Sequence, residues 1–266
     1  MNSIIDISIW KLIASMGILI IPFAFLLYYK IPLIRSILIA VIRMVAQLSL
    51  VAVYMEWIFE VNNMWINMLW VFLMIFVGVF TSIKRIGLYK KYFVLPLTLS
   101  AISAVIIIDT FFLGYVLKLD YVFDARYFIP ITGMILGNSM NHNIVGLSTY
   151  FRGLSEKAEL YYFLLTNTGN VTLTRRPFVK QAITQGLNPL IATMTVIGLI
   201  SLPGMMTGQI LGGSSPAMAI RYQIMIMFAI FGGCSINMFL SIIFSNRFIF
   251  DKYGKLKMDI VKGVES

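Results

Sequence analysis

The stretch from Leu12 to Tyr29 reads LIASMGILIIPFAFLLYY and carries no charged side chain. A bilayer core about 30 Å thick needs roughly 20 apolar residues to be crossed by an α-helix. Similar stretches recur along the chain, in which 59% of the 266 residues are hydrophobic and only 12% are charged. This composition is typical of a membrane protein with several spans and is not that of a soluble domain.

Seven apolar stretches are candidates for membrane-spanning helices. They cover residues 12–29, 32–55, 64–81, 93–117, 127–149, 187–211 and 219–245. The sequence therefore predicts an all-α fold, a polytopic transmembrane helical bundle in which every backbone polar group is satisfied within its own helix. Residues 1–266 are interpreted as a single transmembrane domain. Because the number of spans is odd, the two ends of the chain are expected on opposite sides of the membrane.

The basic side chains are distributed unevenly over the connecting segments. Most of the 21 lysines and arginines fall on one set of alternating loops and on a short basic C-terminal tail, residues 246–266. Lys and Arg concentrate on the cytoplasmic side of membrane proteins, so the N-terminus is predicted outside and the C-terminus inside. The net charge of +10 then suits the anionic membrane lipids of the inner leaflet and requires no nucleic acid.

Polar side chains inside spans are costly and are therefore candidates for function. Arg43 lies near the centre of the second predicted span, and Gln47 follows it by one helical turn on the same face. Asp109 is the one carboxylate well inside a predicted span. A pair between Arg43 and Asp109 would lower the cost of burying either charge. Such a pair is interpreted either as a clamp between two helices or as part of a substrate path.

Two spans contain a similar pattern of proline, glycine and amide residues. Residues 127–143 read YFIPITGMILGNSMNHN, and residues 201–213 read SLPGMMTGQILGG. Glycines four residues apart leave a helix face on which another backbone approaches closely. The glycines predicted to pack in this way are Gly133, Gly137, Gly204, Gly208 and Gly212. The residues predicted to line or gate a translocation path are Arg43, Gln47, Asp109, Asn138, Asn141, Pro203, Met205, Met206, Thr207 and Gln209.

Pro203 is expected to interrupt the hydrogen-bond ladder of the sixth predicted span and to let that helix bend. Glycine packing alone, without a role in transport, accounts for the same pattern and remains the simpler interpretation of most of these glycines.

The chain offers little chemistry for catalysis or metal binding. His142 is the only histidine and Cys234 the only cysteine, so neither a histidine cluster nor a disulfide is expected. The 17 methionines are interpreted as apolar filling rather than as metal ligands. The chain contains no HExxH, GxSxG or GxxxxGK[ST] motif. We therefore expect a protein that is not an enzyme and binds no cofactor, with any ATP hydrolysis on a separate subunit.

The longest predicted loop covers residues 150–186 and is expected in the cytoplasm. Its apolar residues recur at helical spacing, which predicts two short amphipathic helices lying against the membrane surface. Such a loop either rests on lipid headgroups or docks into a partner protein.

Three segments, IPITGMILGNSMN, SLPGMMTGQILGG with the following SPAMAIRYQI, and IRMVAQL, resemble the FetB-type permease subunits of ABC transporters. This family is associated with iron export in bacteria and is related to plant membrane proteins of aluminium tolerance. The resemblance covers nearly the whole chain. It implies a permease in the plasma or inner membrane, assembled as a homodimer with a separate ATPase subunit that binds the ATP.

The resemblance also implies that the loop around Gly169 is the coupling segment that meets the ATPase. The residues assigned to ATPase coupling are Glu159, Leu160, Gly169, Arg175 and Arg176. The residues by themselves leave the substrate open, because one aspartate, one arginine and several amides suit a chelated metal, an anionic conjugate or a small metabolite as well as iron. The alternative function is a self-contained ion- or proton-coupled carrier in which Asp109 titrates.

The orientation can be tested with reporter fusions. A reporter attached after Ser266 is expected to read as cytoplasmic, and one inserted near Asn62 as external, because of the distribution of basic residues. Reporter activity in intact cells measures both positions, and the reverse result at both would contradict the predicted orientation.

Overall fold

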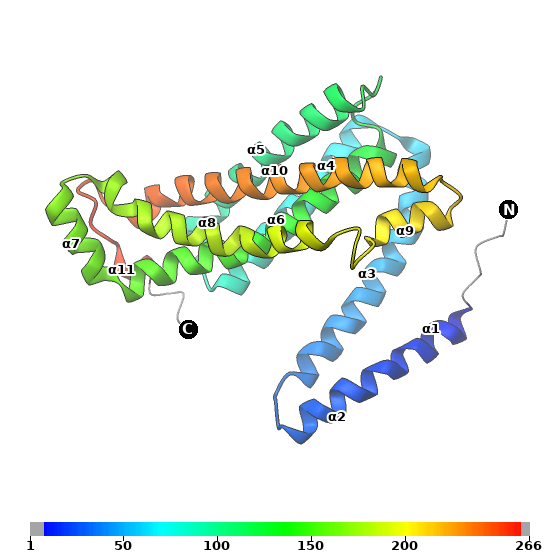
Figure 1. Ribbon diagram of the computed structural model, residues 1–266, viewed down its shortest axis with the longest axis horizontal. Coiled ribbons are helices and arrows are strands. Elements are labelled where there is room, and N and C mark those ends of the chain that lie inside the picture. The colour runs from blue at the N-terminus through cyan, green and yellow to red at the C-terminus, as the bar shows by residue number, and fades with distance from the viewer. Residues whose placement is uncertain (1–7, 262–266) are drawn as a thin grey trace. The chain divides into compact units, whose positions relative to one another are not determined.

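The computed structural model describes residues 8–261, and all named elements within them are helices. The predicted all-α fold class is thereby confirmed. The chain divides into two compact units, Met1–Val61 with Leu211–Ser214 and Asn62–Ile210 with Ser215–Ser266. We call them unit 1 and unit 2; the helices of both are drawn in Figure 1. The prediction of a single functional domain stays a prediction.

Unit 1 contains two apolar helical stretches joined by a short turn. The first is formed by α1 (Ile9–Ser15), a 3₁₀ segment η1 (Met16–Leu19) and α2 (Ile20–Tyr28), and the second is α3 (Ile34–Val61). Both are long and apolar enough to cross a membrane. The most apolar 18-residue window of each stretch is 0% buried, so the described residues of unit 1 form no core of their own. Their apolar side chains suit contact with lipid or with another protein surface.

Unit 2 is a bundle of long helices with a few short ones. Its elements are α4 (Met64–Ile86), α5 (Lys90–Asp109), the π-helical segment η2 (Thr110–Val116), α6 (Ala125–Glu156), α7 (Ala158–Thr168), α8 (Val171–Val196), α9 (Gly204–Leu211), α10 (Pro216–Ile249) and α11 (Met258–Val261). The last residue of α9 belongs to unit 1. The long helix α6 packs against α4, α8 and α10, and α10 also packs against α5.

Five segments of the described chain have the length and apolarity of membrane spans. They are Trp10–Tyr28, Ile34–Val61, Met64–Ile86, Lys90–Val116 and Pro216–Ile249. They coincide with five of the seven predicted spans. The predicted span 127–149 lies within α6, which carries more polar residues, and the total of seven spans stays a prediction.

The sixth predicted span, residues 187–211, is wrong as a continuous helix. Helix α8 ends at Val196 and α9 begins at Gly204. Between them the chain turns at Gly198, whose φ of 86° is in the left-handed region, and Gly198 N donates to Ser201 O at 2.9 Å. Pro203 therefore precedes a helix instead of kinking one, and it suits that place because it has no N–H to donate.

The predicted loop 150–186 contains helices, as expected, but they take up almost all of it. Its cytoplasmic position stays a prediction. Helix α6 continues to Glu156, α7 follows after one residue, and the second expected short helix is the start of the long helix α8. Helix α8 buries one residue per turn along most of its length. These buried residues are Thr174, Phe178, Ala182, Gly186 and Leu190. The predicted tail likewise begins later, because α10 extends to Ile249.

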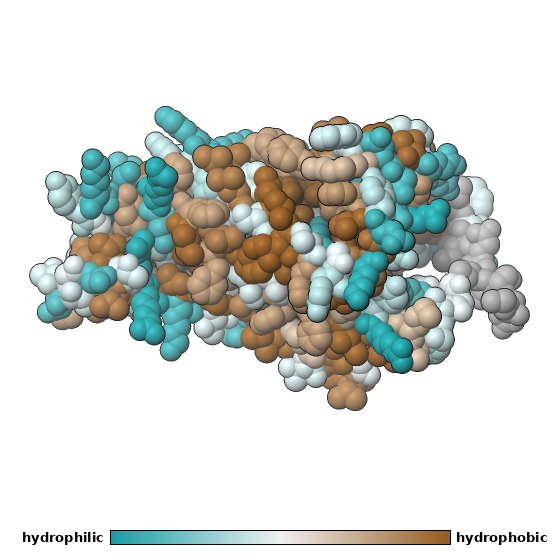
Figure 2. Space-filling view, turned by 90° about the horizontal axis from the view of Figure 1, so that it is seen from above, coloured by the Kyte–Doolittle hydropathy of each residue, from teal (hydrophilic) through white to brown (hydrophobic). Residues whose placement is uncertain are grey.

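Helices α7 and α11 lie at the same end of unit 2, on the left in Figure 1. We call this the coupling end and define it as α7, the first two turns of α8, the last turn of α10 and residues 250–261. In Figure 2 hydrophilic side chains gather at this end and also on the right of the view, and a broad apolar surface lies between the two groups. This separation of polar and apolar surface is typical of a bundle that leaves the membrane at that end.

Helices α6 and α8 cross at two glycines that no local pattern indicated. A Cβ atom added at Gly186 would collide with Met238 Cε and would lie 3.1 Å from the Cα atom of Gly146. At Gly146 an added Cβ would lie 2.8 Å from Met238 Sδ and 3.3 Å from the carbonyl oxygen of Ala182. The two backbones therefore meet directly, with the buried side chain of Met238 from α10 filling the space beside them.

This crossing predicts an effect of Gly186→Ala on stability. The added methyl group has no room against the Gly146 backbone, so we expect a loss of roughly 1–3 kcal/mol of stability, measured by thermal unfolding in detergent. Gly137→Ala is the matched control, because an added Cβ at Gly137 meets nothing within 4 Å. Equal unfolding temperatures for the two variants would show that the helices do not meet at Gly186.

Candidate functional site

A carboxylate is buried inside unit 2, at the end of α5. Asp109 is only 4% exposed at the end of α5. Its Oδ2 atom accepts a hydrogen bond of 2.6 Å from Thr132 Oγ1 of α6, whereas Oδ1 has no hydrogen-bond partner within unit 2. A carboxylate oxygen in a low-dielectric surrounding strongly favours a proton, a cation or a polar ligand as a partner. Asp109 therefore offers one free ligand position.

The helix changes its form at the same residue. Asp109 is the last residue of α5, and the π-helical turn η2 begins at Thr110. At the end of η2 the amide of the next residue, Leu117, donates to Phe112 O at 2.9 Å, five residues back. Such wide turns are rare and occur frequently at functional sites. The change widens the helix next to the buried carboxylate.

A cavity of about 290 Å³ opens beside Asp109 between α4 and α5. Asp109 and Thr110 contribute its polar groups, and its walls are apolar side chains such as Val71, Val105 and Phe128. A mainly apolar cavity with few polar groups is the usual form of a small-ligand site. Asp109 is the polar anchor of this cavity.

The predicted partner of Asp109 belongs to the other unit. Arg43 and Gln47 lie one turn apart on α3, as expected, within unit 1. Asp109 lies in unit 2. The Arg43–Asp109 pair and the place of Gln47 in a translocation path therefore stay predictions.

A second polar site connects three helices in the core of unit 2. The hydroxyls of Ser100 (α5) and Ser241 (α10) lie 2.7 Å apart. Asn143 Nδ2 of α6 donates to Ser241 Oγ at 3.2 Å, and Ser241 Oγ donates to Asn237 Oδ1 at 3.3 Å. All four residues are buried. Buried polar groups of this kind fix the register of neighbouring helices, because each needs its partner.

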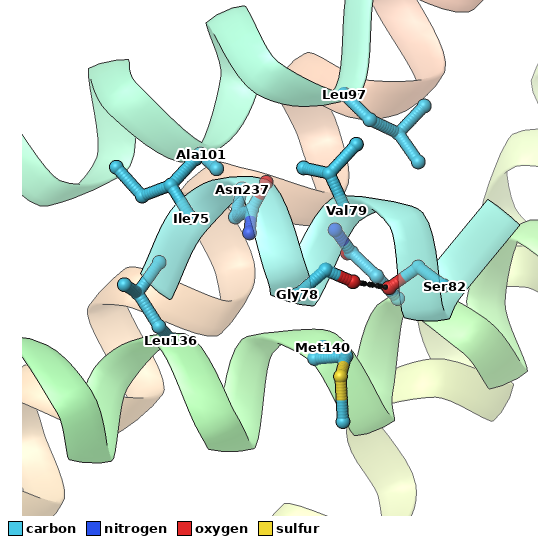
Figure 3. Close-up of a pocket in the computed structure, with 10 residues that line it drawn as sticks. Ile75, Gly78, Val79, Ser82, Leu97, Ala101, Leu136, Met140 and Asn237 are labelled. Atoms are coloured by element: carbon cyan, nitrogen blue, oxygen red, sulfur yellow. Dashed lines mark hydrogen bonds between the residues drawn. The ribbon is translucent and has the colours of Figure 1, made fainter. Parts of the chain in front are cut away.

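This network borders a small cavity of about 20 Å³ among α4, α5, α6 and α10 (Figure 3). Its walls include Ser82, whose hydroxyl donates to Gly78 O in the same helix at 2.9 Å. Asn143 Oδ1 has no hydrogen-bond partner among the described residues. The cavity has room for one water-sized group, and Asn143 provides an acceptor for it.

Of the three asparagines near His142, only one enters this network. Asn138 Nδ2 donates to Met134 O of its own helix at 2.9 Å, and Asn141 is exposed. His142 Nδ1 lies 2.8 Å from the carbonyl oxygen of Gly186, which ties α6 to α8 beside the glycine crossing. Asn143 was missed in favour of its neighbours, although burial at every third or fourth position of α6 distinguishes it. The role of Asn138 and Asn141 in a path stays a prediction.

The predicted glycine faces have few close neighbours within unit 2. A Cβ added at Gly133 would lie 3.1 Å from Met74 Cε, whereas at Gly137, Gly204 and Gly208 it would meet nothing. Gly212 lies beyond the end of α9, so it does not share a helix face with Gly204 and Gly208, and its role in packing stays a prediction. Packing of the other glycines against a second copy of the chain stays a prediction.

The remaining residues of the predicted gate serve mainly as packing or capping groups. Met206 is buried, and Met205 packs against the apolar cluster around Leu190 and Ile230. Thr207 donates from its amide and its hydroxyl to Pro203 O, at 3.0 and 3.2 Å. Gln209 is half-buried. The role of these residues in a translocation path stays a prediction.

Helix α7 presents a small apolar face at the coupling end. Leu160 is 45% exposed and Phe163 is 65% exposed, and these residues lie three apart on the same side of the helix. Glu159 is exposed beside them. Gly169 ends α7 with a φ of 59°, and an added Cβ there would meet nothing. Gly169 is therefore required by the backbone conformation rather than by close packing.

The opposite side of α7 is fixed by the C-terminal segment. Tyr161 is fully buried and its hydroxyl donates to Gly254 O at 2.6 Å, while Tyr162 Oη accepts from Leu256 N at 3.2 Å. Burial raises the pKa of Tyr161 to about 12, against a lowering effect of the Arg175 cation. The Tyr161 hydroxyl therefore stays protonated and keeps its hydrogen bond at neutral pH. The part of the predicted basic tail around Gly254 and Leu256 therefore packs against α7.

The two arginines assigned to coupling differ in their surroundings. The Arg175 guanidinium lies over the Phe250 ring, 5.1 Å from its centroid, and Arg175 Nε donates to Val171 O at 3.2 Å. Arg176 is exposed. Arg175 thus holds the C-terminal segment against α8, and only Arg176 is available to a partner.

The described residues contain no group of three or more histidine, cysteine, aspartate or glutamate side chains that could hold a metal ion. A hard or borderline metal ion prefers such ligands. Within the described residues of one chain, Asp109 is the one carboxylate that combines burial with an adjacent cavity.

Comparison with known proteins gives matches over most of the chain. Residues 9–250 match a family described as uncharacterised protein family UPF0014. The UPF0014 membrane protein YjkA of Bacillus subtilis is 28% identical over 230 residues, which cover 85% of this chain and 88% of YjkA. Protein ALUMINUM SENSITIVE 3 of Arabidopsis thaliana is 30% identical over 199 residues, which cover 74% of this chain and 71% of that protein.

A protein of Escherichia coli named probable iron export permease protein FetB is 26% identical over 237 residues, which cover 88% of each chain. No solved structure matches the chain. With its apolar helices and its relatives among membrane proteins, the chain is a multi-pass membrane protein.

The contact between Thr132 and Asp109 predicts an effect of Thr132→Val. Valine has a similar shape but cannot donate, so it leaves the buried carboxylate without its hydrogen bond, at a cost of roughly 1–3 kcal/mol. Thermal unfolding in detergent measures this loss, and Thr132→Ser serves as the control because serine keeps the hydroxyl. Equal stability of the valine and serine variants would mean that the bond does not support the site.

Proposed function

Because the chain belongs to uncharacterised protein family UPF0014 and is similar to a protein named as a probable iron export permease, we propose that it is the permease subunit of an ABC transporter. It exports iron or another metal or small solute across the cell membrane, and two copies assemble with separate ATPase subunits. The chain itself catalyses no reaction and binds no cofactor, and ATP binds to its partner.

The observation that carries this proposal is the geometry of α7. A short helix at the polar end of a membrane bundle exposes Leu160 and Phe163, while Tyr161 and the C-terminal segment hold its other side in place. An exposed apolar pair on a rigid helix is well suited to insert into a groove of another protein. Movement of the partner would then be transmitted to α6 and α8, which adjoin α7 at its two ends.

The transported group passes near Asp109 in this proposal. The free carboxylate oxygen, the cavity of about 290 Å³ and the adjacent wide turn of η2 provide a polar position inside an apolar bundle. One carboxylate does not hold a bare iron ion by itself. The substrate is therefore a metal that keeps ligands of its own, or a small solute, or it is bound by groups of two copies together.

The unpartnered oxygen of Asp109 also favours a second candidate function, a self-contained carrier coupled to protons or other ions. In that case Asp109 takes up and releases the coupling ion, and no ATPase is needed. Dependence of transport on an ATPase subunit distinguishes the two functions.

The docking role of α7 predicts the effect of Phe163→Ala. Truncation of an apolar anchor is expected to weaken binding of the ATPase subunit at least about tenfold, measured by titrating purified ATPase subunit onto the detergent-solubilised chain. Tyr253→Ala is the matched control, since Tyr253 is an 87% exposed aromatic residue at the same end but outside α7.

Unchanged affinity of the Phe163→Ala variant, or an equal loss in both variants, would place ATPase docking elsewhere. Helix α7 would in that case rest on the lipid headgroups.

A further inference from the structure

A second groove lies away from Asp109, between α8 and α10 at the coupling end. Its volume is about 580 Å³, which lies in the range of roughly 300–1,000 Å³ typical of small-molecule sites. Ile183 of α8 and Phe239 and Ile243 of α10 form its apolar walls. Phe239 and Ile243 are about half exposed, so the groove opens on the outer surface of the bundle rather than into its core.

The polarity of the groove changes along its length. Helix α8 begins and α10 ends at the coupling end, and there the groove is bordered by Arg176 and Lys180, which are both exposed. Arg247 follows Ile243 by one turn on α10 and adds a third cation on that face. Ile183 and Phe239 lie further along the two helices, away from this end. The cations of the groove thus lie towards the coupling end, together with Leu173 and Val179, and the walls from Ile183 and Phe239 onwards carry no charge.

The positive charge of the groove is not compensated within it. No aspartate or glutamate contributes to its walls. Arg175, which also borders the groove, is already engaged with the Phe250 ring and with Val171 O. Arg176 and Lys180 are therefore the groups through which the groove would bind an anion.

We propose that this groove binds an anionic phospholipid. Its phosphate lies between Arg176 and Lys180, and one acyl chain follows the apolar walls past Ile243 towards Ile183. Charge complementarity favours this occupant, because a phospholipid combines a negative head with an apolar tail in the same order as the groove, and basic pockets between membrane helices bind such headgroups. The long side chains of Arg176 and Lys180 reach the level of the headgroups while their stems cover apolar surface.

Native mass spectrometry of the full chain in detergent tests the proposal, with phosphatidylglycerol and phosphatidylcholine of identical acyl chains as probes. We expect the chain to retain phosphatidylglycerol in preference to phosphatidylcholine. The double variant Arg176→Gln with Lys180→Gln is expected to weaken phosphatidylglycerol binding by about thirtyfold. The control is Lys84→Gln with Arg85→Gln, which removes two exposed cations at the end of α4 and is expected to leave that binding unchanged.

A second variant, Ile183→Trp, fills the apolar part and leaves every cation in place. It is expected to reduce phosphatidylglycerol binding as well, whereas a site for a free phosphate ion would be unaffected by it and would be emptied by inorganic phosphate. The proposal is overturned if the groove variant and the control variant bind phosphatidylglycerol equally. It is also overturned if Ile183→Trp has no effect on phosphatidylglycerol binding. A third contradicting result is that the Arg176→Gln, Lys180→Gln variant still binds phosphatidylglycerol but no longer binds the ATPase subunit or a second copy of the chain.

Discussion

The backbones of α6 and α8 meet at Gly146 and Gly186, and the other contacts of unit 2 depend on this close crossing. Side chains at these two positions would separate the helices, because the space is already filled by the two backbones and by Met238. With the crossing in place, His142 reaches the carbonyl of Gly186, and α6 lies between α4 and α10. The same helices continue to the coupling end, where α7 connects them.

The hydrogen bonds between helices inside the bundle are exchangeable, whereas the glycine crossing is fixed. The Thr132–Asp109 bond and the network of Ser100, Asn143 and Ser241 each join two or more helices, and each leaves one oxygen without a partner. Hydrogen bonds within a membrane contribute modestly and can be exchanged for other partners. A bundle with a fixed crossing and exchangeable polar contacts suits a protein that changes conformation during transport. In this account a bound solute and the partner at α7 each change the relative populations of the conformations of the bundle.

The sequence predicted the helical class and five long apolar helices because apolarity and length are averages over many residues, and such averages tolerate local error. The same averaging concealed the break at Gly198 to Pro203, where a few residues end one helix and start another. The surroundings of the glycines also depend on more than local spacing. Gly204 and Gly208 match a local spacing rule yet have open space around them, whereas Gly146 and Gly186 are far apart in sequence and meet only through the tertiary fold. Asn143 was missed because the choice among three nearby asparagines depends on which face of α6 is buried.

The most direct test of the account is whether the purified chain needs an ATPase to move solute. The chain should be isolated from its native membrane in mild detergent, its associated proteins identified, and solute flux measured in vesicles with and without them. The account predicts a phosphate-loop ATPase subunit that accompanies the chain, and flux that requires both this subunit and ATP. Flux by the chain alone, driven by an ion gradient and unaffected by ATP, would contradict it.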